Sequence, residues 1–84
     1  MAASPRRPTP VALADLAPGS SARVESVSEA SALGRRLQDL GFVPGTEVRV
    51  VRRAPLGDPI EFELRGYRLC LRRTEAREIR VLPA

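Results

Sequence analysis

Glycine and proline divide this 84-residue chain into short segments, and this punctuation limits what it can fold into more than any other feature. Turn signals stand at Pro18-Gly19, Pro44-Gly45, the stretch 54–59 and Gly66. The length allows one domain with a small core. Because the chain has only two Phe, one Tyr and no Trp, that core must be built mainly from Leu, Val and Ile.

Between these breaks, polar and apolar residues alternate with the period of two that is typical of half-buried strands. This alternation predicts five strands, at Ala22–Val27, Glu47–Arg53, Ile60–Arg65, Tyr67–Arg73 and Glu78–Leu82. In the two strands around Gly66, the inward positions would be Ile60, Phe62, Leu64, Tyr67, Leu69 and Leu71. The neighbouring Val50 and Val51 break strict alternation, so we expect a bulge there.

One segment has helical periodicity instead, and it predicts a helix over about residues 29–40. Four apolar residues repeat at spacings of three and four and would share one face: Ala30, Leu33, Leu37 and Leu40. Ser28 is the expected N-cap, and Glu29 in the first turn would suit the helix dipole. Gly41 stands where a left-handed C-cap favours glycine.

Five short strands cannot bury a flat sheet well, whereas a small barrel buries one face and removes the exposed edges. The sequence therefore predicts a mainly β fold, a five-stranded SH3-like barrel with one inserted helix, over residues 11–84. Leu13 and Leu16 fit one helical turn, and Thr74–Arg77 fits the single turn that such a barrel needs before its last strand. Residues 1–10 hold three prolines without periodicity and are expected to form a disordered tail.

The sequence lacks residues that several classes of function require. The chain has no His and a single cysteine, Cys70, which we expect to fill a strand position rather than react. Glu61 and Glu63 would face the same side of a strand, but Arg65 shares that side, so solvation is expected rather than a metal site. We therefore expect no enzyme activity, no metal and no cofactor. No membrane span or signal peptide is recognisable, so a cytoplasmic location is expected.

Nucleic-acid binding is the alternative that the charge pattern raises. The net charge is +4, and all basic residues are arginine. Arginines cluster on the predicted strands at Arg49, Arg52, Arg53, Arg65, Arg68, Arg72 and Arg73, and a small RNA- or DNA-binding barrel could use them. Acidic residues interrupt this cluster, and the aromatics fall at inward positions. An outer face laced with ion pairs is therefore the favoured interpretation, and no nucleic-acid partner is expected.

Three stretches together resemble a known family. They are Leu37-Gln-Asp-Leu-Gly-Phe-Val-Pro-Gly45, Ala54-Pro-Leu-Gly-Asp-Pro59 and Leu69-Cys-Leu-Arg-Arg-Thr-Glu-Ala76, the last followed by Ile79-Arg-Val81. The chain is similar to FeoA, the small cytoplasmic protein encoded with the FeoB ferrous iron transporter. This resemblance implies an SH3-like barrel and a non-catalytic accessory role. The implied partner is FeoB, a membrane protein with a cytoplasmic GTP-binding domain, so the chain would be peripheral to the membrane only through it.

Two surfaces are candidates for docking that partner. The first is the loop with Leu56, Gly57, Asp58 and Pro59, where prolines lower the cost of ordering. Either Leu56 is presented at the loop tip, or it folds back over the barrel end while Asp58 caps the turn. The second surface is the outer helix face with Arg35 and Arg36, which could pair with acidic groups or simply be solvated. Gly41, Pro44, Gly45 and Gly66 are interpreted as structural turn residues.

Overall fold

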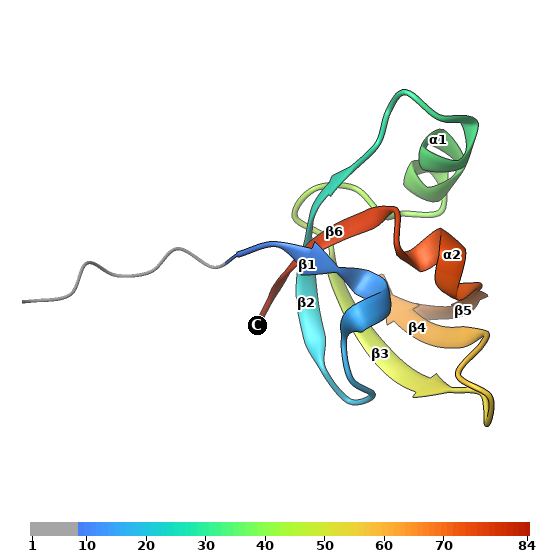
Figure 1. Cartoon of the computed structure of the whole chain (residues 1–84). Coiled ribbons are helices and arrows are strands. Elements are labelled where there is room, and N and C mark those ends of the chain that lie inside the picture. Colours follow the sequence, from blue (N-terminus) through green and yellow to red (C-terminus); the bar gives the residue numbers. More distant parts are fainter. Residues whose placement is uncertain (1–8) are drawn as a thin grey trace, which may run out of the picture.

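A computed structural model describes residues 9–84 of the chain, and its elements form one antiparallel sheet with short helices at its margins (Figure 1). The strands are β1 (Val11–Ala12), β2 (Ser21–Val27), β3 (Glu47–Arg53), β4 (Ile60–Leu64), β5 (Tyr67–Leu71) and β6 (Ile79–Pro83). The helical segments are the 3₁₀ turn η1 (Leu13–Asp15), α1 (Ala32–Asp39) and α2 (Arg73–Ala76). Residues 1–8 of the predicted tail lie outside the described residues.

The five predicted strands correspond to β2 through β6 with ends that differ by at most two residues, so the mainly β prediction is confirmed. The register of β3 against β4 shifts between Val50 and Arg52, which confirms the predicted bulge at Val51. The turn expected around Leu13 is η1, and the turn expected before the last strand is α2. A sixth strand, β1, was not predicted because two residues are too few to show alternation.

The sheet bends around its core but does not close through hydrogen bonds. Its strand order is β1-β6-β2-β3-β4-β5, and no pairing joins β1 to β5 within residues 9–84. The two end strands, β1 and β5, are therefore not hydrogen-bonded to each other in the described residues, and β5 pairs on one side only, with β4.

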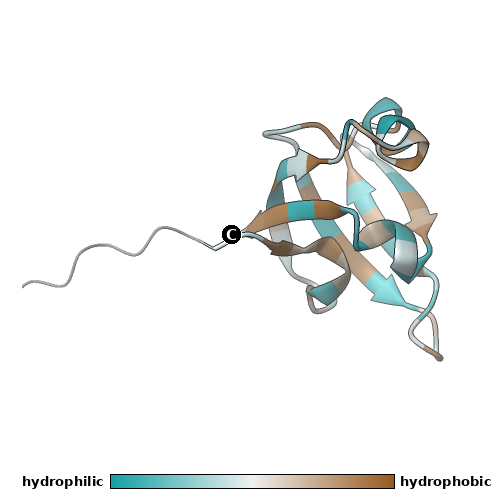
Figure 2. Cartoon of the chain, turned by 45° about the horizontal axis from the view of Figure 1, so that its top comes forward, coloured by the Kyte–Doolittle hydropathy of each residue, from teal (hydrophilic) through white to brown (hydrophobic). Residues whose placement is uncertain are grey.

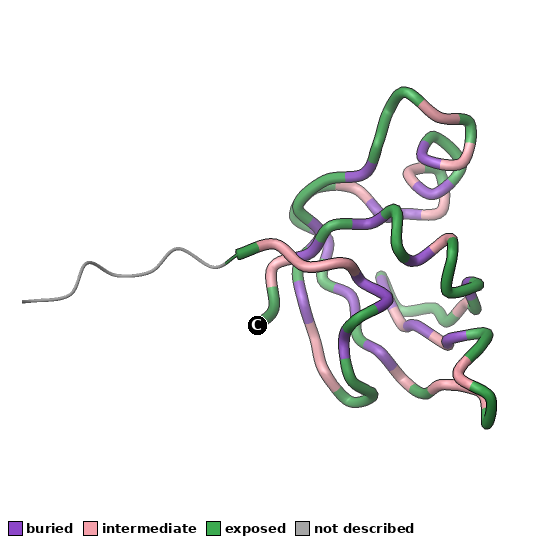
Figure 3. The backbone as a smooth tube through the Cα atoms, in the orientation of Figure 1, coloured by how far each residue is buried: buried purple, intermediate pink, exposed green. Residues whose placement is uncertain are grey.

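The inward faces of the strands form one apolar core, visible as alternating brown bands along the strands in Figure 2 and as buried stretches in Figure 3. Phe42 and Phe62 are its largest fully buried side chains, as the inward positions predicted. Tyr67, also expected to point inward, is instead 40% exposed. Its hydroxyl donates a hydrogen bond to the Leu40 carbonyl, which satisfies the phenol at the surface.

The helix α1 is shorter than predicted and begins at a different cap. Ser31, not Ser28, is the N-cap: its hydroxyl accepts a hydrogen bond of 2.9 Å from the Gly34 backbone N–H. Ala30 consequently lies outside the helix and is exposed, contrary to the predicted apolar stripe. The helix ends in a Schellman motif, in which the Gly41 N–H donates to Gln38 and the Phe42 N–H to Leu37. Gly41 has a φ of 113°, a conformation that L-residues with side chains resist.

Among the helices of the described residues, none combines the length and the apolar character that crossing a lipid bilayer requires.

Gly34 is a packing position that the sequence pattern does not reveal. A Cβ placed there would lie 1.6 Å from the carbonyl oxygen of Ser28, because the segment before the helix folds back across its first turn. We therefore expect Gly34→Ala to destabilise the domain by about 2 kcal/mol, as overpacking does. Elsewhere in a helix the same change stabilises by about 1 kcal/mol, so the sign is diagnostic.

Chemical denaturation measures this difference directly. Asp39→Ala, on the exposed side of the same helix, is the control and should stay within about 0.5 kcal/mol of the unmodified domain. A Gly34→Ala variant as stable as this control would show that the close approach to Ser28 does not constrain the fold.

Candidate functional site

The loop between β3 and β4 projects from the sheet, and hydrogen bonds hold its base. The Ala54 N–H donates to the Pro59 carbonyl at 3.0 Å, and the Gly57 N–H donates to the Ala54 carbonyl at 2.7 Å. The loop therefore continues the hairpin as a closed turn rather than a loose excursion. In Figure 1 it projects away from the body of the sheet at the far end from both described termini.

The structure decides between the two alternatives for Leu56. Its side chain is 96% exposed and so does not fold back over the barrel end. The Asp58 carboxylate does not close its own turn either: it accepts a hydrogen bond of 2.9 Å from the Arg73 backbone N–H, at the start of α2. This contact ties the far side of the loop to α2, so Leu56 is presented from a braced support.

Arg53 supports the other side of the loop, a role that no local sequence pattern reveals. Its guanidinium donates two hydrogen bonds of 2.7 Å, to the carbonyl oxygens of Ala14 and Leu16. The side chain is half-buried and links the end of β3 to the η1 turn. A guanidinium suits this position because its planar fork can satisfy two carbonyls at once. This contact depends on where the end of β3 lies relative to η1 in space. The sequence alone does not show that position.

A hollow of about 350 Å³ lies at the base of the loop. Its lining combines the two prolines Pro55 and Pro59 with Ala54, Cys70, Glu61, Arg52 and Arg53. The exposed Leu56 and this hollow are adjacent parts of one loop, so a partner could cover both. The exposed apolar side chain of Leu56 and the partly apolar hollow therefore lie on neighbouring parts of the surface.

The second predicted surface lies apart from the loop. Arg35 and Arg36 are both exposed on α1, which stands at the opposite end of the molecule from the 54–59 loop in Figures 1 and 2. The Arg35 guanidinium reaches the Glu29 carbonyl at 3.5 Å, the outer limit of a hydrogen bond. The structure thus does not bring the predicted site residues together: they form two separate surfaces.

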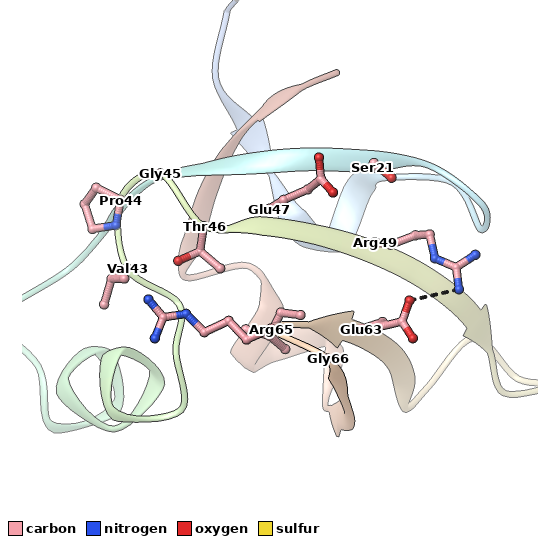
Figure 4. A pocket seen from close by; sticks show the side chains of 11 residues that line it. Ser21, Val43, Pro44, Gly45, Thr46, Glu47, Arg49, Glu63, Arg65 and Gly66 are labelled. Atoms are coloured by element: carbon pink, nitrogen blue, oxygen red, sulfur yellow. Dashed lines mark hydrogen bonds and ion pairs between the residues drawn. The ribbon is translucent and has the colours of Figure 1, made fainter.

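A larger groove, of about 810 Å³, crosses the outer side of the sheet, and no sequence pattern pointed to it (Figure 4). Its charged lining residues are Glu47, Arg49, Glu63 and Arg65, and the turn residues Pro44, Gly45 and Gly66 stand at its rim. Both signs of charge are present in equal number. The groove is therefore suited to a polar segment of either charge, and its chemistry does not select one ligand.

The outer face of the sheet carries the ion pairs that the sequence favoured. Arg49 and Arg68 lie on either side of Glu63, at 3.1 Å and 3.4 Å from its carboxylate oxygens. Arg52 pairs with Glu61 at 2.7 Å. The hydrogen bond from Arg49, followed by that from Arg68, holds the pKa of Glu63 below its ordinary value of 4.5. The carboxylates of Glu61 and Glu63 thus both pair with arginines on the outer face of the sheet.

Metal-ligating clusters and unpaired buried polar atoms are the two features that would point to a further polar site in the described residues. Within residues 9–84, no three His, Cys, Asp or Glu side chains gather closely enough to hold a metal ion. No buried side-chain nitrogen or oxygen in that range lacks a hydrogen-bond partner. Cys70 is exposed on β5 and lines the hollow at the loop base together with Glu61, whose carboxylate pairs with Arg52.

The chain is similar to proteins of ferrous iron transport. The FeoA domain model matches residues 11–83. The fused Fe(2+) transport protein A and Fe(2+) transporter FeoB of Porphyromonas gingivalis is 35% identical over 69 residues. That match covers 82% of this chain but only 8% of the relative's length, so the chain corresponds to a small part of that protein.

Two of the solved structures with this fold illustrate the similarity. The FeoA-like protein of Clostridium acetobutylicum is 38% identical with a TM-score of 0.84, over 88% of this chain and 86% of that one. The zinc-complexed FeoA of Stenotrophomonas maltophilia is 41% identical with a TM-score of 0.73, over 82% of this chain and 86% of that one. The latter is described as an SH3 domain protein and a candidate activating factor of ferrous iron transport. The predicted SH3-like fold is thereby confirmed.

The lowered pKa of Glu63 gives a prediction about pH. A carboxylate whose folded pKa lies below its unfolded value stabilises the fold above the unfolded pKa. We expect this contribution to be lost as the pH falls below about 4.5 and through the folded pKa. An NMR titration of the side-chain carboxyl carbon should give Glu63 a pKa below 4.5, and Arg49→Ala should raise it toward that value.

Glu63→Gln is the matched control, because it keeps the shape and removes the titration. Its stability should depend less on pH in this window than that of the unmodified domain. An unaltered Glu63 pKa in the Arg49→Ala variant would contradict the assigned cause.

Proposed function

This chain belongs to the FeoA domain family, and on that basis we propose that it is a non-catalytic accessory module of ferrous iron uptake that binds the cytoplasmic part of a FeoB-type transporter. One observation carries the proposal: in the Porphyromonas gingivalis relative, Fe(2+) transport protein A and the transporter FeoB are one fused chain. Fusion holds two domains at high effective concentration, which is useful where they act on one another.

The 54–59 loop is the docking element that we propose. Leu56 at 96% exposure is the most exposed large apolar side chain among the described residues. The loop base is fixed by Arg53 on one side and by the contact between Asp58 and Arg73 on the other. A preorganised apolar tip loses little conformational entropy on binding, so it can contribute more of its buried area to affinity.

The outer face of α1 is the second proposed contact. Arg35 and Arg36 follow one another along this helix and are exposed, and neither forms an ion pair within residues 9–84. Guanidinium groups bind carboxylates in a bidentate manner, so an acidic patch on the transporter would complement this face. Charged contacts at a rim mainly affect the association rate and its dependence on salt.

Nucleic-acid binding receives less support from the same residues. Three of the strand arginines on which it would depend, Arg49, Arg52 and Arg68, already pair with glutamates on the sheet. A phosphate would have to compete with those carboxylates. A labelled oligonucleotide should therefore show no shift at low salt, where phosphate contacts are strongest.

Leu56→Glu tests the loop, and Arg35→Glu tests the helix face. We expect Leu56→Glu to weaken binding to the purified cytoplasmic domain of FeoB by about tenfold or more, as expected for a central apolar contact. Arg35→Glu should weaken binding less and mainly slow association. Both variants should unfold at the temperature of the unmodified domain, because both side chains are exposed. Surface plasmon resonance measures the two rates.

Leu56→Met is the matched control and should retain binding, because it keeps the apolar tip. If both charge-introducing variants bind as the unmodified domain does, the two proposed surfaces are wrong. If the unmodified domain binds neither the cytoplasmic domain nor the full-length transporter in detergent, the proposed function is wrong.

A further inference from the structure

The strand β5 ends the sheet and leaves one side of its backbone unpaired. It is hydrogen-bonded only to β4, and the other end strand, β1, pairs with β6 instead. Along β5, the residues Tyr67, Arg68 and Cys70 are exposed, and Leu69 is half-buried. In Figure 1 the strand forms the margin of the sheet beyond β4. An exposed edge of this kind is a template for one more strand.

The hairpin turn identifies which backbone groups face outward. Arg65 and Gly66 have φ values of 51° and 81°, the two positive values of a type I′ two-residue turn. In such a hairpin the flanking residues Leu64 and Tyr67 form a hydrogen-bonded pair, and the pairs then alternate along the ladder. Arg68 and Cys70 therefore direct their N–H and C=O groups away from β4. No backbone bond outside the strands uses these groups within residues 9–84.

A row of charges on the outer face of the sheet ends on a cation at the β5 edge, and this favours an added strand that carries an acidic residue. Directly opposite residues on three neighbouring strands form a row, Arg49 on β3, Glu63 on β4 and Arg68 on β5. Glu63 contacts both arginines, so the row alternates in sign and ends on a cation at the edge. The next position outward would place a carboxylate opposite Arg68. A basic strand would meet like charge there, at a cost to pairing.

We propose that the β5 edge is a docking site for an extended segment of a partner protein, which adds as a further strand and carries an acidic residue opposite Arg68. Residues next to that acid in the segment would be apolar, because they would lie beside the half-buried Leu69 on the inner face. Backbone hydrogen bonds to Arg68 and Cys70 supply the affinity, and the cation supplies the selectivity. This edge is distinct from the 54–59 loop tip, although the Cys70 side chain lines the hollow at the base of that loop and the Tyr67 hydroxyl bonds the Leu40 carbonyl at the end of α1.

A second copy of this chain fits the edge less well. Two β5 edges that pair antiparallel through both outward residues would set Arg68 opposite Arg68, Cys70 or Arg72 of the other copy. None of these is acidic, so the end of the charge row would remain unmatched or meet like charge. The charge pattern therefore selects a different chain.

The test uses a capped eight-residue peptide in which valine alternates with threonine and one central threonine is replaced by glutamate. The matched peptide carries lysine in place of the glutamate. Added to the ¹⁵N-labelled full chain, the glutamate peptide should shift the Arg68 and Cys70 amides and slow their hydrogen exchange. The lysine peptide should bind about fivefold more weakly, the preference expected of one cross-strand charge pair.

Two variants separate the backbone contribution from that of the charge. Arg68→Gln should bring the affinities for the two peptides to within about twofold of each other. Cys70→Pro removes one outward N–H and should abolish binding, whereas Cys70→Ser should preserve it. If Cys70→Pro does not fold, the result for Arg68→Gln alone tests the proposal.

Three results would overturn the proposal. The first is no slowing of exchange at Arg68 and Cys70 at millimolar peptide. The second is an unchanged preference for glutamate in Arg68→Gln. The third is protection of these amides that rises with the concentration of the chain alone, which would assign the edge to a second copy.

Discussion

The structure depends on sealing a small apolar core that its sheet alone cannot enclose. Five short strands and a two-residue sixth strand surround the core incompletely, so segments outside the strands must exclude water. Leu13 and Ala14 of η1, Phe42 after α1 and Ala76 of α2 are all fully buried for this reason. The caps and turns that place these segments are therefore as necessary to the fold as the strand ladder, since a domain of this size has little core to spare.

The sheet could be predicted from the alternation of polar and apolar residues and from the turn-forming residues between the strands. A period of two is a local signal, so the strands, the bulge at Val51 and the burial of Phe62 could all be predicted from adjacent residues. The errors occurred where a longer-range contact overrides local preference. Ser31 replaces Ser28 as the N-cap because the chain folds back over Gly34, and Tyr67 stays at the surface because the end of α1 offers its hydroxyl an acceptor.

The candidate site was predictable only in part, for the same reason. The exposed apolar residue Leu56 could be picked out as one without a place on a strand face. Its two supports, Arg53 and the contact of Asp58 with the Arg73 backbone, join positions 15 or more residues apart and leave no pattern in the sequence. Likewise, the row of Arg49, Glu63 and Arg68 needs the register of three strands before its alternation appears.

The pairing of β1 with β6 has a consequence for how this domain can be attached to other chains. Val11 lies opposite Val81, so both ends of the described fold leave from the same place, at the opposite side of the molecule from the 54–59 loop (Figure 1). A linker joined to either end would act as a stalk that holds the domain without covering that loop. A domain fused through either end would therefore still present the 54–59 loop on its outward side.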